Sequence, residues 1–182
     1  MKKYLDEQEE RFPMPTDETV TVEVGDRLAI VNGCFGSRVN ETLGKIYAAL
    51  LTARFGESVG MTADPYRIIL ELPRNMKRED ILQTILSVKP GTIEALSRMT
   101  ILNSSFLRWR FVFVAKKFGI IEKTADHRFM NFSRLFDLHK DTPAYKEAVN
   151  KVLWEDLDIP DSEMVVSKIA SGEIEVVSGT IS

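Results

Sequence analysis

Strand-like and helical patterns occupy different parts of this sequence, and their separation limits the possible folds more than any other feature. Near the N-terminus apolar residues alternate with polar ones, as at Val20, Val22 and Val24, with the period of a half-buried β-strand. Strands are predicted over residues 20–24, 27–32, 59–63 and 66–72, with a last short strand over 173–177. Helical periodicity dominates the remainder. The pattern predicts an α+β fold, with a small mixed or antiparallel sheet built from N-terminal hairpins and packed with a helical C-terminal half.

Most of the predicted helices lie between the fourth strand and the last, while one precedes the strands and one separates the two hairpins. They cover residues 4–11, 37–55, 77–88, 92–99, 104–118, 132–139, 142–154 and 161–170. Ser37 is expected to act as the N-cap of the helix over 37–55. Gly44 and Ala48 lie opposite the main apolar arc of that helix, where small side chains allow another element to approach closely. We therefore expect it to be buried on two sides.

Cysteine and histidine are too scarce for disulfide or zinc stabilisation. The 182 residues include one cysteine, Cys34, and two histidines, His127 and His139, whereas a Cys/His zinc site needs about four ligands. A single cysteine is typical of a reducing compartment, so a cytoplasmic location is expected. The charged start of the chain predicts no secretory signal, and no apolar run approaches the ~18 residues of a membrane span. The length fits a single domain over residues 1–182, and no metal, cofactor or membrane partner is expected.

Positive charge is concentrated in one segment of an otherwise acidic chain. The formal net charge is −3, yet residues 104–140 contain eight Lys or Arg and three Asp or Glu, a net charge of +5. Such a segment can be the electrostatic footprint of a nucleic-acid-binding surface. The alternative is an ordinary solvated helix face, which is how most runs of charge are used. Charge alone does not separate the two.

The helix over 104–118 carries the most informative pattern. On a helical projection, one side gathers Leu107, Phe111, Val114 and Phe118, and is predicted to face the core. Another side gathers Phe106, Trp109, Arg110, Phe113, Lys116 and Lys117. Aromatic rings interleaved with cations suit single-stranded nucleic acid, because bases stack on the rings while phosphates meet the cations. The alternative is that Trp109 and Phe113 pack on a neighbouring element while the lysines extend outward.

A glycine turn joins a predicted strand to the helix over 37–55. Gly33 and Gly36 bracket it, and Ser37 and Arg38 follow at the start of the helix, where free backbone N–H groups attract anions. The turn is not a phosphate-binding P-loop, because the Gly-Lys-Ser/Thr ending is absent. A tight turn that simply requires glycine dihedral angles is the favoured interpretation.

Residues of catalytic or metal-binding type do not form a convincing site. Cys34 has no histidine near it in the sequence, and Asp64 and Glu71 lack the spacing of an acid/base pair. Four further candidate metal ligands, without a compact helix or loop spacing, are Asp126, His127, Asp137 and His139. No catalytic residue and no metal ligand is therefore assigned.

Three stretches taken together resemble a known family. They are Asn32–Gly44 (NGCFGSRVNETLG), Thr62–Ile68 (TADPYRI), and Ser104–Phe111 (SSFLRWRF) followed by VAKKFG at 114–119. In this order and at these distances they resemble the DEAD/H-associated region of the large helicase-related (Lhr) helicases, especially archaeal ones. The resemblance extends from about residue 12 to residue 177. Lhr helicases place two RecA-like ATPase domains and a winged helix before this region, and this chain has neither Walker motif.

The resemblance implies a part of a larger machine, either excised or separately encoded. The parent would be an ATP-dependent 3′-to-5′ helicase, whereas this chain alone would not be an enzyme and would help to hold the tracked strand. The implied partners are single-stranded DNA or an RNA:DNA hybrid, together with the ATPase and winged-helix domains. Trp109 matches an aromatic residue that stacks on a base in this family. The residues predicted to bind nucleic acid are Trp109, Arg110, Lys116, Lys117, Arg108, Ser37 and Arg38. The alternative is a structural module that docks on the other domains without touching nucleic acid.

Overall fold

The computed structural model describes residues 18–73, 76–102, 104–126, 128 and 130–181, and excludes the side chains of Ser105 and Phe106. The helix predicted over 4–11, His127 and the Phe106 ring lie outside the described residues. The chain divides into two compact units. Residues Glu94–Asp158 form one, called here the helical unit, and the described residues on either side of it form the sheet unit.

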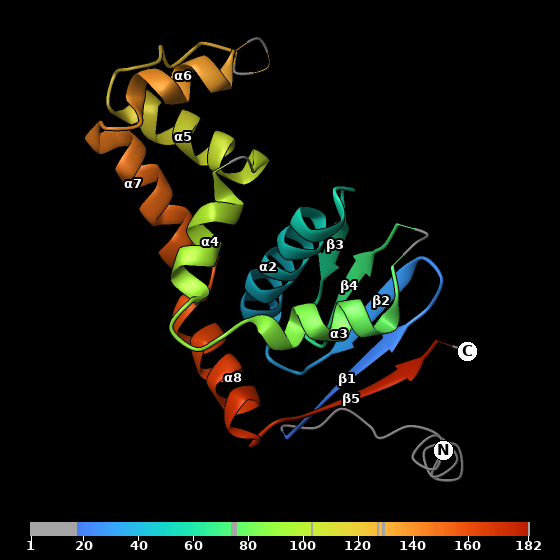
Figure 1. Cartoon of the computed structure of the whole chain (residues 1–182). Coiled ribbons are helices and arrows are strands. Elements are labelled where there is room, and N and C mark those ends of the chain that lie inside the picture. The colour runs from blue at the N-terminus through green and yellow to red at the C-terminus, as the bar shows by residue number, and fades with distance from the viewer. Residues whose placement is uncertain (1–17, 74–75, 103, 127, 129, 182) are drawn as a thin grey trace, which may run out of the picture. The chain divides into compact units, whose positions relative to one another are not determined.

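The sheet unit is built on a mixed sheet whose strand order is β3-β4-β2-β1-β5 (Figure 1). Its strands are β1 Thr19–Val24, β2 Leu28–Asn32, β3 Gly60–Ala63, β4 Arg67–Glu71 and β5 Glu175–Thr180. β1 and β2 form an antiparallel hairpin, as do β3 and β4, and β2 pairs antiparallel with β4. β5 pairs parallel with β1. The predicted α+β class with a small mixed sheet is therefore confirmed.

Alternation along the strands produces the buried face of the sheet. Val22 of β1 lies opposite Val31 of β2, which in turn lies opposite Ile68 of β4, and all three side chains are buried. Helices α2 (Ser37–Phe55) and α3 (Arg78–Ser87) lie side by side over one face of the sheet (Figure 1). Helix α8 (Ile159–Ser171) packs against α2. Elements from both ends of the described part of the chain, β1 and α8, thus belong to the same compact unit.

Helix α2 is buried on more than one side, as its sequence predicted. Its buried residues include Leu43 and Ile46 on one side and Gly44 and Ala48 on another. A Cβ atom at Gly44 would lie 2.7 Å from the Met61 Cε of β3, so glycine allows the close approach of helix and sheet. The predicted cap was wrong by one residue. Gly36, at φ 86°, occupies the N-cap position without a side-chain hydrogen bond, and Ser37 is the first helical residue.

The helical unit is formed by helices that follow one another with short connections. They are α4 Ile93–Ile101, α5 Ser105–Lys117, α6 Phe132–His139, α7 Pro143–Lys151 and η2 Val152–Asp156. η2 is a π-helical turn that continues α7, and its last bond runs from the Leu157 N–H to the Val152 carbonyl, five residues back. Within the described residues, no helix has the length and apolar character needed to cross a membrane.

Phe111 of α5 forms the centre of the helical unit. Its ring is fully buried and meets Phe136 of α6 edge-on, with 5.3 Å between ring centroids, and Tyr145 of α7 at 5.8 Å. Such edge-to-face contacts are the favoured geometry of packed aromatic rings. Burial raises the pKa of the Tyr145 phenol. These contacts fix which side of α5 faces inward and therefore which side remains outside.

Candidate nucleic-acid interface

Local signals fix the bounds of α5. The Ser104 hydroxyl accepts a hydrogen bond from the Leu107 N–H at 3.1 Å, an N-cap that satisfies one of the first free donors of the helix. Gly119, at φ 71°, follows the last turn, where the left-handed conformation favours glycine. Leu107, Phe111 and Val114 are buried, as predicted. Trp109 and Phe113, on another side of α5, therefore lie outside this core.

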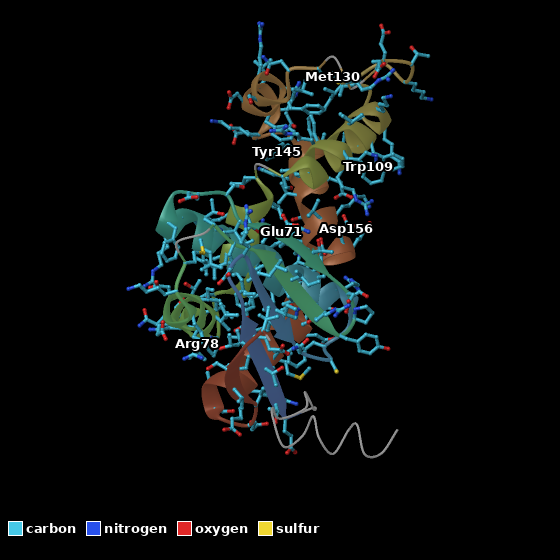
Figure 2. The ribbon with its side chains drawn as sticks, turned by 90° about the vertical axis from the view of Figure 1, so that its right-hand side faces the viewer. Glu71, Arg78, Trp109, Met130, Tyr145 and Asp156 are labelled. Carbon is cyan, nitrogen blue, oxygen red and sulfur yellow. The ribbon has the colours of Figure 1, made fainter. Side chains whose placement is uncertain are left out.

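Trp109 and Phe113 form an exposed pair of stacked rings, called here the aromatic platform. Their centroids are 6.2 Å apart and the ring planes differ by 16°. Trp109 is 56% exposed and Phe113 is 48% exposed. The alternative in which both rings pack into the core of this unit is excluded by these values. Trp109 projects from α5 in Figure 2, on the same side of the helical unit as Asp156.

Two cations accompany the platform. The Lys117 Nζ lies 4.7 Å from the centre of the Phe113 ring, and the Arg110 Cζ lies 5.2 Å from the centre of the Trp109 ring. Both distances are within the range of cation–π attraction. The predicted face of α5 therefore places Trp109, Arg110, Phe113 and Lys117 together.

Arg110 is also held by acids on η2. Its Nε donates to the Asp156 Oδ2 at 2.7 Å and its Nη2 donates to the Asp156 Oδ1, so the pair is bidentate. Glu155 Oε2 lies 3.9 Å from the Arg110 Nη1. The hydrogen bonds that Arg110 donates to the Asp156 carboxylate raise the pKa of Arg110. Sequence reasoning missed both acids, because they are distant from α5 along the chain and lie beyond the helix predicted over 142–154.

The two remaining basic residues predicted on α5 point to different surroundings. Lys116 Nζ donates to the backbone carbonyls of Lys123 and Ala125, each at 3.0 Å. These hydrogen bonds hold the loop that follows α5 against the end of the helix. Arg108 lies on another side of the helix, with its Cζ 5.9 Å from the centre of the Phe132 ring. These contacts direct Lys116 and Arg108 to groups other than the platform rings, and their predicted role toward nucleic acid stays a prediction.

Phe118 corrects the predicted core stripe of α5. It was expected to be buried with Leu107 and Phe111, yet it is 55% exposed. The reason is that the helix ends at Lys117 and Phe118 is its C-cap residue, beyond the last turn that packs against α7. Phe118 thus provides an exposed aromatic ring, on the other side of α5 from Trp109, that can serve as a control for Trp109.

The glycine turn before α2 is joined by hydrogen bonds to a loop of the sheet unit that is distant in the sequence. Buried Asn40 donates from Nδ2 to the Gly33 carbonyl at 3.0 Å and to the Asp64 carbonyl at 2.8 Å. The Gly36 N–H donates to the Pro65 carbonyl at 3.0 Å. These contacts join the stretch 32–44 to the stretch 62–68. Sequence reasoning missed the role of Asn40, although an asparagine in the first turn of an apolar helix was a usable signal.

Ser37 and Arg38 lie exposed in the first turn of α2. They belong to the sheet unit, whereas the platform belongs to the helical unit.

Asp64 accepts backbone hydrogen bonds from Tyr66 and Arg67 and pairs with the Arg67 side chain at 2.9 Å. It therefore caps a turn, as does Asp126 through the Arg128 N–H at 3.0 Å. Among the described residues, no group of three or more His, Cys, Asp or Glu side chains is placed to hold a metal ion.

Comparison with known proteins gives consistent results. The chain is similar to the ATP-dependent helicase Lhr-Core of Methanocaldococcus jannaschii, with 28% identity over 96% of this chain and 22% of that protein. It is 25% identical to ATP-dependent helicase Lhr-Core protein 2 of Thermococcus barophilus, again over 96% of this chain and 22% of that protein. The chain thus spans about a fifth of the length of these relatives.

A solved structure shares the fold. It is the structure of the Mycobacterium smegmatis helicase Lhr bound to single-stranded DNA and AMP-PNP. It matches 99% of this chain and 25% of its own chain, with a TM-score of 0.82 and 21% sequence identity. The model of the family described as DEAD/H associated matches residues 14–182. The resemblance deduced from the three sequence stretches is confirmed, and the chain belongs to the DEAD/H-associated family.

Proposed function

We propose that this chain is a non-catalytic accessory region of an Lhr-type ATP-dependent 3′-to-5′ helicase, and that it helps to hold the tracked single strand. One observation carries the proposal: Trp109 and Phe113 are stacked on each other and remain exposed beside Lys117. An unpaired base stacked on an aromatic side chain contributes about 1–3 kcal/mol to binding. Phe113 supports one side of the exposed indole before any base arrives, which reduces the ordering cost of binding.

The names of the similar proteins support the proposed function. The archaeal relatives are named ATP-dependent helicases, and the Mycobacterium smegmatis protein was solved with single-stranded DNA and AMP-PNP. We infer that the ATPase and winged-helix domains of such a parent are the protein partners of this chain. ATP binding and turnover would then belong to those domains. We expect the purified chain to show no nucleic-acid-stimulated ATP hydrolysis, and turnover abolished by a substitution within this chain would contradict the assignment.

Cations divide into two groups in this proposal. Lys117 lies beside the platform and is suited to a phosphate next to the stacked base. Arg108 and Lys116 lie elsewhere on α5, while Ser37 and Arg38 begin α2, where the positive end of the helix dipole favours an anion. We propose them as secondary backbone contacts. Phosphate contacts of this kind position a strand without reading its sequence.

A second candidate function rests on the same rings. Exposed aromatic side chains are also typical of protein interfaces, and Trp154 of η2 adds another exposed ring to the helical unit. In this alternative the platform docks on the winged-helix or ATPase domains and does not touch nucleic acid. The two functions differ in what the isolated chain does: strand binding requires weak, measurable affinity for single-stranded DNA, and docking does not.

The deciding experiment compares the exposed Trp109 ring of α5 with the exposed ring of Phe118, the C-cap residue of the same helix. Binding of a fluorescently labelled single-stranded oligonucleotide is measured for the wild type, Trp109→Ala and the matched control Phe118→Ala across a salt series. Strand binding predicts a loss of about 1–3 kcal/mol for Trp109→Ala, nearly independent of salt, and little change for Phe118→Ala. Lys117→Ala should reduce the slope of log affinity against log salt by about one unit. Equal binding by wild type and Trp109→Ala would leave the docking function.

A further inference from the structure

We propose that Arg110 is a positioning residue: Asp156 holds it against Trp109, and the pair fixes the orientation of the platform instead of contacting a phosphate. This inference rests on the proposed function in so far as the platform binds a strand. It concerns a contact between α5 and η2, whose partners are 46 residues apart in the sequence. The consequence is that an acidic residue, Asp156, supports a nucleic-acid-binding surface.

The geometry of the pair leaves Arg110 little freedom. Two guanidinium nitrogens are engaged by the two oxygens of Asp156, and a third lies 3.9 Å from Glu155. The Arg110 side chain is 19% exposed and that of Asp156 is 12% exposed. A bidentate pair that is largely withdrawn from water is geometrically specific. In this position the guanidinium also lies 5.2 Å from the Trp109 ring centre, so the ring rests against a fixed cation.

The surrounding charges oppose a phosphate at Arg110. A phosphate there would have to displace Asp156 and would meet the charge of Glu155. Glu155 is a carboxylate at neutral pH, as glutamates ordinarily are, and the hydrogen bond that it accepts from Lys151, at 2.7 Å, lowers its pKa further. Breaking a withdrawn ion pair leaves one charge without its partner, which is costly. Arg110 is thus a poor phosphate ligand. Lys117, over the neighbouring Phe113 ring, also interacts electrostatically with Glu155, but among the described residues it forms no bidentate pair with an acid.

The π-helical turn explains how the acids come to face α5. The bond from Leu157 N–H to Val152 O at 3.0 Å inserts one residue relative to an α-helical turn and re-aims the side chains at the end of α7. Such turns occur frequently at functional sites. The chain here uses one to bring Glu155 and Asp156 to the same guanidinium. The support of the platform therefore depends on this local irregularity.

The first test measures the platform without nucleic acid. In a Trp154→Phe background Trp109 is the remaining tryptophan, and time-resolved fluorescence anisotropy reports its motion. Asp156→Ala and Arg110→Ala are both expected to increase the amplitude of fast indole motion. The matched control is Glu94→Ala, which removes the acid of another ion pair, with Arg98, in the helical unit. Unchanged anisotropy in both test variants, with their folds intact by circular dichroism, overturns the proposal.

The second test uses single-stranded DNA and gives opposite signs for the two roles. If Arg110 positions Trp109, then Arg110→Ala and Asp156→Ala both weaken binding about two- to tenfold, the double variant is no weaker than either, and the salt slope is unchanged. Arg110→Lys should not restore binding, because lysine lacks the bidentate fork. If Arg110 contacts a phosphate, Asp156→Ala tightens binding and Arg110→Ala lowers the salt slope by about one unit, which overturns the proposal.

The two tests separate this inference from the proposed function. Absent DNA binding, or binding indifferent to Trp109→Ala, contradicts the proposed function, and the anisotropy measurement still decides whether Asp156 and Arg110 position the ring. Loss of binding in Trp109→Ala together with the phosphate pattern at Arg110 preserves the proposed function and removes the positioning role. A variant that fails to fold is replaced by Asp156→Asn, which keeps the shape and one acceptor oxygen but removes the charge.

Discussion

The glycine turn of the sheet unit and Trp109 of the aromatic platform both lie in stretches that carry the family resemblance, yet the two regions use their residues in opposite ways. In the turn, Asn40 is 1% exposed and its amide donates to two backbone carbonyls. In the platform, Trp109 is 56% exposed and contacts Phe113 and Arg110. A buried polar group with internal partners contributes to folding, whereas an exposed aromatic ring invites a partner. A family motif can therefore mark either a residue that stabilises the fold or a residue that is exposed to a binding partner.

The largest stability effect is expected at Asn40. Asn40→Ala removes the donor of a buried contact to the Gly33 carbonyl and of a partly buried contact to the Asp64 carbonyl, and leaving these groups unpaired costs about 3 kcal/mol. Unfolding in urea, followed by far-ultraviolet circular dichroism, measures this loss. Both tryptophans, Trp109 and Trp154, belong to the helical unit, so tryptophan fluorescence followed in parallel reports that unit. A stable Asn40→Ala protein would show that the turn is not held by this side chain.

A smaller loss is expected where α2 meets the sheet. Gly44→Ala places a Cβ atom 2.7 Å from the Met61 Cε and 2.9 Å from the Ile68 Cγ2, too close for either contact. The flexible Met61 side chain can move away, while Ile68 is part of the buried sheet face, so a cost of about 1–3 kcal/mol is expected. The same urea experiment measures it, with Ala53→Gly on the exposed side of α2 as a comparison. No loss would mean that the helix shifts freely over β3 and β4.

The platform is expected to respond little in stability and most in binding. Trp109→Ala should change the free energy of unfolding by no more than about 0.5 kcal/mol, the usual range for surface substitutions. Thermal unfolding followed by circular dichroism is suited to this variant, which lacks one of the two tryptophans. A stability loss of about 3–5 kcal/mol would indicate a core residue instead and would remove the contrast with Asn40.

The smallest effect is a pH dependence at the turn. Hydrogen bonding from the Tyr66 backbone, and then from the Arg67 side chain, lowers the pKa of Asp64 from its ordinary value of 3.8. Because the folded-state pKa is the lower one, the stabilisation is present above pH 3.8 and is lost as the pH falls through the folded value. Asp64→Asn should lack this component. Urea unfolding at pH 7 and below pH 3.8 compares the two proteins, and identical pH profiles would contradict the assignment.

The elements of the fold were largely predictable, because their signals are local. Alternating apolar residues located β1, β2 and β4 to within a residue or two, and the helix predicted over 104–118 matches α5 to within one residue at each end. The choice of core side was also correct for Leu107 and Phe111. The prediction failed at Phe118, because a helical projection assumes that the helix continues, whereas α5 ends one residue earlier. The prediction of Ser37 as a cap also failed, because Ser37 is already the first residue of α2 and Gly36 is the N-cap residue.

The sequence by itself determined the α+β class, the order of helices and strands, and the gathering of rings and cations on one side of α5, since each depends on residues near one another in the chain. Tertiary structure alone decided that β5 runs parallel to β1, that Asn40 joins two separate stretches, and that Asp156 holds Arg110 beside Trp109. These contacts bring together segments that are separate in the sequence, and the hydrophobic periodicity of the sequence does not predict them. Their formation depends on how the packed elements align, which is settled only when the whole core assembles.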